Sequence, residues 1–395
     1  KALEIDKTNN TSLRYMQEIK QNGKLINKYT YDSLNELKEE YDYVNKFYIN
    51  YSYDGAGNLQ NKYEQVLDPT YGYPTGTQNG NTYEYTDTSW KDKLTKVNGS
   101  NISYDANGNP LTYRDGMSMT WKNGRQLTTL TNGDTSISYG YDSDSVRTTK
   151  TVNGVKYTYA YLNGQLMYET RGDAKFYYSY DSNGILYNVR YTLTDGGTEY
   201  SYYYTHNSRG DIVGIYNGAG ELKAHYEYDA WGNVISITDN NGNAITNPNH
   251  IGNLNPFRYR GYYQDTETGL YYLMSRYYDT ITHRFINADG YFQSGGSILD
   301  ANTFAYCGNN PVLNVDPLGT CKVPNYTSAG TYIGHTWKIK ESVPGVPGFC
   351  NVCKGYGSNA PSNTSHSFVI SSYTTPSTKK QDYNTWNKVA DSFGA

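Results

Sequence analysis

Residues 228–235 read YDAWGNVI, and variants of this stretch recur along the chain. Three further copies are YDGAGNL from Tyr53, YDANGNPL from Tyr104 and YDSNGIL from Tyr180. The Tyr-Asp pair alone occurs at positions 31–32, 41–42, 53–54, 104–105, 141–142, 180–181, 228–229 and 278–279. Because a repeated unit sets the architecture of a chain, this motif is the first guide to the fold.

Each position of the repeat has a physical role. Tyr226 and Tyr228 alternate along the chain, which places their rings on one face of a strand. The Asp or Asn side chain can accept a hydrogen bond from the backbone two residues further on, and so begins a turn. Gly then takes the left-handed conformation, and an apolar residue opens the return strand. The repeat therefore predicts β-hairpins.

Further hairpins lie between the repeats. In the segment YTYAYLNGQLMYE, which begins at Tyr157, apolar and aromatic residues alternate on both sides of Asn163-Gly164, a pair typical of type I′ turns. Residues 50–250 contain no convincing amphipathic helix. We therefore predict a mainly β fold, a long antiparallel sheet that must close, coil or be capped to protect its edges.

Tyrosine dominates the composition. The 395 residues include 47 Tyr but only 9 Phe and 5 Trp, and 18% of the residues are charged. Tyrosine favours strands and buries a large ring while its hydroxyl stays wet or hydrogen-bonded. We therefore expect tyrosine rings to line an inner, hydrated face of the sheet.

The C-terminal residues differ from the rest in charge. Residues 320–395 contain seven Lys, two Asp and one Glu, a net charge of +4, so the whole-chain charge of −4 leaves −4 − 4 = −8 for the remainder. This asymmetry indicates a separate tail, although chance in a short segment is an alternative. The chain begins at Lys1 with no signal peptide or membrane-spanning stretch, so we expect a fragment or processed product whose export signal lies upstream.

Three long segments carry a resemblance to a known family. They are GDIVGIYNGAGELKAHYEYDAWGNVI at 210–235, NPFRYRGYYQDTETGLYYLMSRYYDTITHRFINADG at 255–290 and NTFAYCGNNPVLNVDPLG at 302–319. Together with the repeats they resemble the Rhs/YD-repeat proteins, including the C components of Tc toxins and teneurins. The resemblance implies a spiral β-sheet wound into a shell over residues 1–210, an Rhs-associated core that plugs it over 211–319, and a variable toxin-like domain over 320–395, α+β or β in fold.

The resemblance also implies a function. Bacterial relatives are toxins of interbacterial competition whose shell encapsulates the tail, and many cleave themselves after a DPxG motif with core aspartates. By position these are Asp289 and Asp316, a self-cleaving aspartyl pair that Arg276 and Arg284 would hold. Here Thr320 follows the motif where Leu is usual. The implied partners are the toxin's own tail and an immunity protein, and the implied location is secreted or at the cell surface.

Two alternatives stay open for this part of the chain. Asp before Pro commonly initiates a turn, so DPLG at 316–319 also fits a purely structural role. The whole chain also fits a cell-surface binding or adhesion protein whose Tyr-rich sheet contacts glycans or proteins, with an inert tail.

The tail contains two similar stretches, GHTWKIK from Gly334 and SHSFVIS from Ser365. If they pair as strands, His335 and His366 approach each other and can share the acid and base roles of metal-independent RNA cleavage. The lysines that would hold phosphate are Lys338, Lys340 and Lys354. The alternative is that both histidines are partly exposed residues at strand ends.

Cys350 and Cys353 form a CxxC pair in the same tail. This spacing is half of a zinc site, which His335 and His366, or Cys321, would complete. A disulfide or redox pair fits equally well, as does a Cys nucleophile with a His base. We therefore expect no cofactor in the body, with zinc in the tail as the one metal to test.

Overall fold

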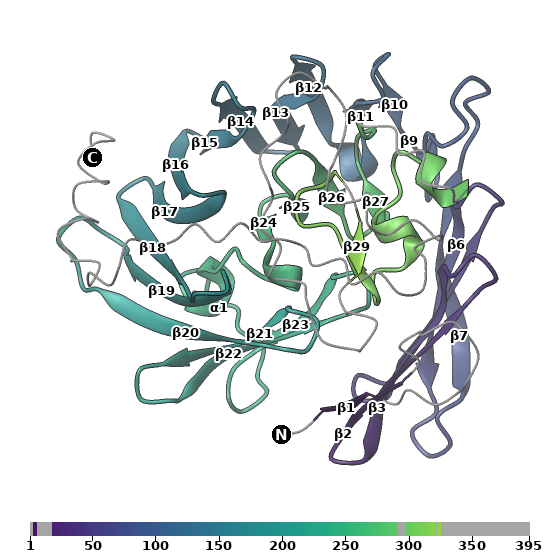
Figure 1. The fold of residues 1–395 in the computed structure, drawn as a ribbon, viewed down its shortest axis with the longest axis horizontal. Helices are drawn as coiled ribbons and strands as arrows, with labels where there is room; N and C mark the ends of the chain where they lie inside the picture. The colour runs from purple at the N-terminus through teal and green to yellow at the C-terminus, as the bar shows by residue number, and fades with distance from the viewer. Residues whose placement is uncertain (1–2, 6–17, 291–297, 321, 325–395) are drawn as a thin grey trace, which may run out of the picture. The chain divides into compact units, whose positions relative to one another are not determined.

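The computed structural model describes residues 3–5, 18–290, 298–320 and 322–324, all within a compact unit, Lys1–Gly357. A second unit, Ser358–Ala395, lies wholly outside the described residues. The described part is almost entirely antiparallel β-sheet, as the repeat predicts (Figure 1).

Two large sheets contain the strands in chain order, each strand paired with the next. The first has nine strands: β1 (Leu3–Ile5), β2 (Glu18–Gln21), β3 (Lys24–Tyr31), β4 (Leu37–Asp42), β5 (Phe47–Tyr53), β6 (Leu59–Leu67), β7 (Pro74–Glu84), β8 (Lys96–Val97) and β9 (Ser100–Asn101). The second has fourteen: β10 (Ser103–Tyr104), β11 (Pro110–Thr112), β12 (Ser118–Lys122), β13 (Gln126–Asn132), β14 (Thr135–Tyr141), β15 (Arg147–Val152), β16 (Val155–Leu162), β17 (Gln165–Arg171), β18 (Ala174–Tyr180), β19 (Leu186–Thr192), β20 (Tyr200–His206), β21 (Ile212–Asn217), β22 (Leu222–Tyr228) and β23 (Val234–Thr238). The second sheet thus continues without a break past residue 211.

The repeat forms the turn that its residues predict. Asp54 Oδ1 accepts hydrogen bonds from the backbone N–H groups of Ala56 and Asn58, both at 2.9 Å, and Gly57 has φ of 78°. The turns that begin at Asp105, Asp181, Asp229 and Asp239 repeat the bond to the residue four positions on. Side-chain capping therefore adds to the backbone hydrogen bonds where each strand reverses.

The hydroxyl of the tyrosine that precedes the turn donates a hydrogen bond to the hairpin before it. The Tyr53 hydroxyl donates to the carbonyl of Leu37 at 2.8 Å, and the Tyr228 hydroxyl donates to the carbonyl of Ile212 at 2.7 Å. Tyr180 makes the same kind of bond. A phenylalanine would fill the same space but leave the carbonyl without this donor, which explains why the motif uses tyrosine.

The inner segment, residues 250–290 and 298–320, packs against these sheets. It contains α1 (Ile251–Leu254), a four-stranded sheet of β24 (Tyr263–Asp265), β25 (Leu270–Tyr272), β26 (Tyr277–Asp279) and β27 (Arg284–Phe285), and the strand β28 (Asn314–Val315), which pairs with β29 (Val323–Pro324). The 3-10 turns are η1 (Arg114–Gly116) in the large sheet and η2 (Tyr259–Gly261), η3 (Ile298–Ala301) and η4 (Cys307–Asn309) in the inner segment. In Figure 1 the fourteen-stranded sheet bends round β24–β27.

This packing corrects one expectation. Tyrosines that face the inner segment are buried rather than hydrated: Tyr178 and Tyr226 are each 1% exposed. Tyr178 packs edge-on against Phe257 of the inner segment, with ring centroids 4.9 Å apart. Desolvation raises the pKa of Tyr272, in β25, to about 12. The prediction of a hydrated inner face is wrong for the described residues because the inner segment fills that space.

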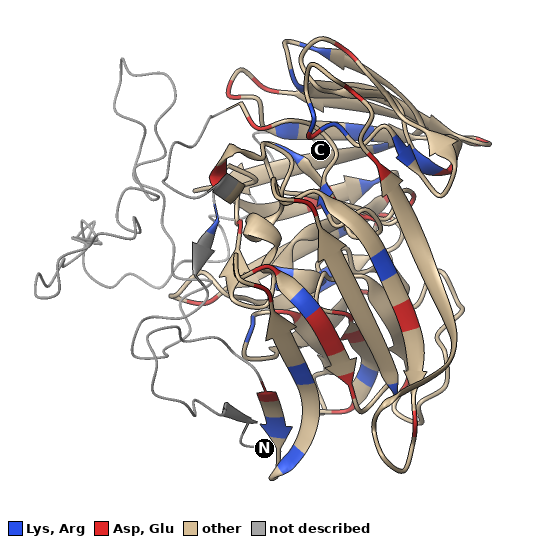
Figure 2. Ribbon diagram, turned by 90° about the vertical axis from the view of Figure 1, so that its right-hand side faces the viewer, with Lys and Arg blue, Asp and Glu red and all other residues tan. Residues whose placement is uncertain are grey.

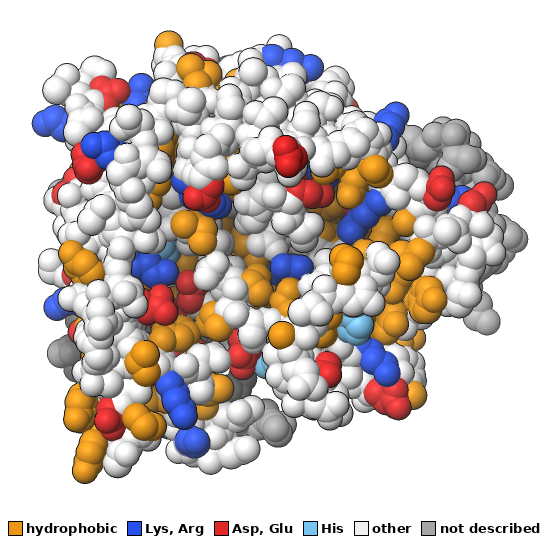
Figure 3. Space-filling model, turned by 180° about the vertical axis from the view of Figure 1, so that it is seen from behind, with side chains coloured by type: hydrophobic (Ala, Val, Ile, Leu, Met, Phe, Trp, Pro, Cys, Tyr) orange, Lys and Arg blue, Asp and Glu red, His pale blue; other side chains and the backbone are white. Residues whose placement is uncertain are grey.

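Charged residues of both signs are interspersed along the strands in Figure 2. Hydrophobic side chains show at several places on the face seen in Figure 3. The exposed large hydrophobic residues include Val66, Tyr71 and Tyr73, at the end of β6 and in the loop that follows it. None of the described helices has the length and apolar character needed to cross a membrane.

Candidate functional site

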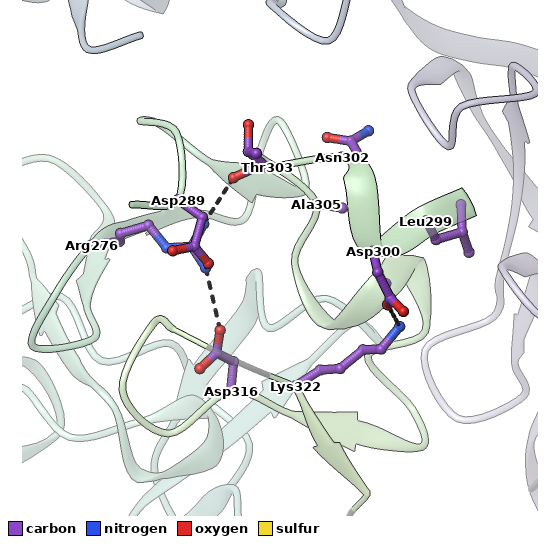
Figure 4. Close-up of a pocket in the computed structure, with 10 residues that line it drawn as sticks. Arg276, Asp289, Leu299, Asp300, Asn302, Thr303, Ala305, Asp316 and Lys322 are labelled. Carbon is purple, nitrogen blue, oxygen red and sulfur yellow. Dashed lines mark hydrogen bonds and ion pairs between the residues drawn. The ribbon is translucent and has the colours of Figure 1, made fainter. Parts of the chain in front are cut away.

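Arg276 brings the two predicted aspartates together. Its Nη2 lies 3.1 Å from Asp289 Oδ2 and 3.5 Å from Asp316 Oδ2. Arg276 immediately precedes β26, Asp289 follows β27, and Asp316 follows β28. Three stretches of the inner segment thus meet at one guanidinium (Figure 4), and Asp316 also lies next to Thr320.

The guanidinium is held in place on several sides. Its central carbon lies 3.5 Å from the centroid of the Phe285 ring, and Arg276 is 4% exposed. Its Nη1 donates to the carbonyl of Thr303 at 2.9 Å, and the same carbonyl accepts the backbone N–H of Asp289 at 2.8 Å. A stacked, hydrogen-bonded arginine has a fixed orientation, so it can position the carboxylates and the chain beside it.

Both the carbonyl and the N–H of the peptide bond between Gly319 and Thr320 are hydrogen-bonded to side chains. Its carbonyl accepts hydrogen bonds from Arg276 Nε and, at 2.7 Å, from Ser275 Oγ. Its N–H, which belongs to Thr320, donates to Asp316 Oδ1 at 3.1 Å. Gly319 has φ of 70°, and a Cβ there would lie 2.9 Å from Ser275 Oγ, so the last residue of the DPLG motif must be glycine.

A cavity of about 40 Å³ lies beside Arg276, Asp289 and Asp316, although neither Gly319 nor Thr320 lines it. Its lining includes Arg276, Asp289, Thr303, Asp300, Asp316 and Lys322. One water needs roughly 10–15 Å³ of such space, so water can reach the carboxylates. The arrangement can donate hydrogen bonds to a carbonyl, supply two carboxylates and admit water, which are the requirements of peptide hydrolysis.

Arg284 does not share this site. Its Nη1 donates to the hydroxyl of Tyr85 at 2.9 Å and its Nη2 donates to the carbonyl of Asp92. It also stacks on the Phe304 ring, with its guanidinium carbon 4.9 Å from the centroid. Arg284 therefore joins the inner segment to the loops around the nine-stranded sheet, and the expectation that it holds the aspartates finds no support in these contacts.

Ser275 was missed by the sequence reasoning. The available signal was its position directly before Arg276, because residues next to each other in a tight turn can contact the same backbone segment. The remaining predicted site residues, which are His335, His366, Lys338, Lys340, Lys354, Cys350 and Cys353, lie outside the described residues. Among the residues that are described, no group of three or more His, Cys, Asp or Glu is placed to hold a metal ion.

A second ionic cluster fastens the inner segment to the fourteen-stranded sheet. Asp265 in β24 lies 2.6 Å from Arg147 Nη1 and 3.0 Å from Lys150 Nζ, both in β15, and all three are 1% exposed or less. Five tyrosine rings surround the Arg147 guanidinium with centroids 4.3–5.8 Å from its carbon. Burial alone would raise the pKa of Asp265, but the two cations outweigh it and hold that pKa below its usual value.

The chain belongs by its structure to the β proteins built from repeats, because its repeats form antiparallel sheets around an inner segment. Comparison with known proteins identifies the family. The sequence matches the RHS Repeat family over residues 206–244. Over 300 residues it is 37% identical to the tRNA3(Ser)-specific nuclease WapA of Bacillus spizizenii, a match that covers 73% of this chain and 12% of the relative. It is likewise 37% identical over 304 residues to the tRNA nuclease WapA of Bacillus subtilis, with the same two coverages.

Solved structures agree on the fold. The Tc holotoxin pore of Photorhabdus luminescens matches 85% of this chain and 17% of its own at a TM-score of 0.60 and 16% identity. TcdB2-TccC3 matches 75% of this chain and 16% of its own at a TM-score of 0.57 and 19% identity. The chain belongs to the Rhs/YD-repeat family and is related to toxins of that family. It spans about an eighth of the length of the WapA relatives.

Proposed function

We propose that this chain is part of an Rhs-type toxin whose β-sheet encapsulates and delivers the C-terminal tail, and that the chain cuts itself between Gly319 and Thr320. One observation carries the proposal. The carbonyl and the N–H of this single peptide bond are each bonded to a residue of the Arg276, Asp289 and Asp316 cluster. A turn that served only to end a domain would need neither the second carboxylate nor the water-accessible cavity.

The chemistry follows from the positions of the groups. Arg276 and Ser275 donate to the Gly319 carbonyl oxygen and stabilise the negative charge that develops on it when water attacks. One of the two neighbouring carboxyl groups keeps its proton: ionised Asp289 takes a proton from that water, and protonated Asp316, next to the Thr320 nitrogen, gives its proton to that nitrogen as the C–N bond breaks. The products are a carboxyl group on Gly319 and an amine on Thr320, and one water is consumed.

A denaturing gel of the purified chain tests the proposal. The wild type should separate into two pieces, and sequencing of the smaller piece should begin at Thr320. Asp289→Asn and Asp316→Asn should each stay at full length, because each removes a carboxylate and preserves shape. Asp195→Asn, at an exposed ion pair with Lys175 in the large sheet, is the control and should still be cut.

A fully intact wild type, under conditions where circular dichroism shows folded sheet, would leave only the structural role of DPLG. Cutting of the wild type at another bond would reject this assignment of the aspartates.

We also propose that the tail is the effector and acts on nucleic acid, most simply RNA. The net charge of +4 in residues 320–395 and the tRNA nuclease relatives support this target. Expression of residues 320–395 in bacteria should arrest growth, and His335→Ala or His366→Ala should relieve the arrest. An immunity protein, secretion or surface display, and zinc at Cys350 and Cys353 are proposals that the same expression system can examine. Healthy growth with folded tail present would favour an adhesion protein instead.

A further inference from the structure

The chain just after the Gly319–Thr320 bond is fastened to the inner segment. In β29, Val323 pairs with Val315 and Pro324 pairs with Asn314, so the chain turns back on itself after the DPLG motif. Between the bond and this strand, Lys322 Nζ lies 2.9 Å from Asp300 Oδ1 (Figure 4). Asp300 belongs to η3, which is separate in sequence from both β28 and β29. The ion pair is therefore a second attachment, independent of the strand pairing.

The Lys322 side chain packs over Gly308 on its way to Asp300. A Cβ on Gly308 would lie 2.6 Å from Lys322 Nζ and 3.2 Å from its Cδ, so the lysine side chain lies flat against this glycine. Gly308 has φ of 58° within η4, and the Asn314 side chain ties η4 to β28 by donating to the Cys307 carbonyl at 3.0 Å. The side chain of Asp300 is 12% exposed and that of Lys322 is 35% exposed, so the pair is half-buried.

We propose that Asp300 and Gly308 form an acidic subsite for a lysine or arginine side chain at the third residue after the cut, and that this subsite positions the bond for cleavage. The inference rests on the proposed function and deepens it, because it assigns a specificity-determining residue to the same reaction. Asp300 acts through Lys322 and is a positioning residue rather than a catalytic one.

The need for such a subsite follows from strand geometry. A strand pair that slips by one residue turns every side chain to the opposite face, and the two residue pairs between β28 and β29 give little resistance to a slip. Val323 and Pro324 cannot make an ion pair, so only one register places a cation at Asp300. That register is the one in which the Thr320 N–H meets Asp316 and the Gly319 carbonyl meets Arg276.

The rate of self-cleavage in the purified full chain provides the test. Asp300→Asn and Lys322→Gln should each slow the cut by about two- to fivefold, the range expected for a half-exposed ion pair. Lys322→Arg should cut at the wild-type rate. The exchanged pair Asp300→Lys with Lys322→Asp should cut faster than either of its single changes, because the attraction is restored. Lys175→Gln, which removes an exposed ion pair with Asp195 in the large sheet, is the control and should change nothing.

Equal rates for Asp300→Asn and the wild type, or no recovery in the exchanged pair, would overturn the subsite. If the wild type is not cut at all, the proposed function fails first, and hydrogen exchange on the intact chain then decides about the subsite. Peptides that cover residues 314–324 should exchange faster in Asp300→Asn than in the wild type if the subsite exists. Identical exchange in the two proteins would reject it.

Discussion

Two ionic clusters of the inner segment use similar residues in different proportions. Around Asp265, the cations Arg147 and Lys150 meet two carboxylates, because Lys150 also pairs with Glu267, and tyrosine rings enclose Arg147. At Arg276, one cation serves two carboxylates beside a water-accessible cavity and a peptide bond. The first arrangement neutralises a buried anion and fits a lock between sheet and inner segment. The second has more carboxylates than cations, so a carboxylate remains that can accept or donate a proton. The ratio of cations to carboxylates and the access of water therefore distinguish a structural ion-pair cluster from a candidate catalytic site.

A third carboxylate extends the comparison to a group held by an amide rather than by a cation. Glu36, in the turn between β3 and β4, accepts a hydrogen bond from Asn309 Nδ2 of the inner segment at 2.7 Å. Burial raises the pKa of Glu36 to about 8, and the bond from Asn309 lowers that pKa only in part. The three cases form a series of one cation, half a cation and no cation for each carboxylate.

The largest expected effect comes from breaking the lock. Asp265→Asn keeps the shape of the side chain but leaves Arg147 buried without a carboxylate partner, while Lys150 keeps only Glu267, 3.0 Å away. We expect a loss of about 3–5 kcal/mol in the free energy of unfolding, because an uncompensated buried charge is strongly unfavourable. Urea unfolding followed by circular dichroism measures it, in an Asp316→Asn background so that cleavage does not interfere. Asp195→Asn, at an exposed ion pair, is the control and should unfold like its parent. Equal midpoints for Asp265→Asn and its parent would show that the cluster is no lock.

The second prediction exchanges arginine for lysine in both clusters. Arg276→Lys keeps the charge but loses the planar fork that reaches Asp289, Asp316 and the Gly319 carbonyl together, so the cleavage rate should fall about 100-fold. Arg147→Lys should lower the unfolding free energy and leave the cleavage rate of the folded protein unchanged. A time course on denaturing gels, paired with urea unfolding of both variants, separates the two. A similar loss of cleavage in Arg147→Lys would erase the distinction between lock and site.

The sequence predicted the strands better than it predicted what covers them. Turn residues such as Asp54 and Gly57 act within five residues of each other, so the repeat alone determines the hairpins. The burial of Tyr178 and Tyr226 depends on residues such as Phe257 and Gly252, which lie at least 26 positions further along, and no local pattern reports such packing. The tyrosine composition therefore suggested a hydrated face that the inner segment fills.

The candidate site divides in the same way. Asp289, Asp316 and Arg276 were selected from the family resemblance, and the structure brings them together. Arg284 was selected on equal grounds, but its side chain points to Tyr85 and Asp92, because one strand position decides which partner an arginine reaches. Asp265 was not selected at all, since its partners lie more than a hundred residues away in β15.

The third prediction uses the carboxylate without a cation. Because the pKa of Glu36 is higher in the folded state than in the unfolded state, the folded protein holds a proton that the unfolded chain has released. This stabilisation is complete below about pH 4.5 and is lost as the pH rises through 8. Allowing for solvent screening, the unfolding free energy should fall by about 1–2 kcal/mol between pH 5 and pH 9 from this group. Glu36→Gln keeps the acceptor for Asn309 and should remove that part of the fall, as urea unfolding at both pH values would reveal. The same pH dependence in both proteins would contradict the assignment.

The smallest effect concerns the hydroxyl groups that join the hairpins. Tyr228→Phe removes the donor to the Ile212 carbonyl and preserves the buried ring, so the unfolding free energy should fall by about 1 kcal/mol. Tyr203→Phe is the matched control, because that residue is 44% exposed, and it should have no measurable effect. Tyr53 and Tyr180 make equivalent bonds in distant hairpins, so their losses should add to that of Tyr228. Several dispersed bonds of this size would together approach the single Asp265 lock, which would mean that the sheet is held by its repeats and the inner segment by its charges. A triple variant no weaker than Tyr228→Phe alone would show instead that the hydroxyls were chosen for another reason than stability.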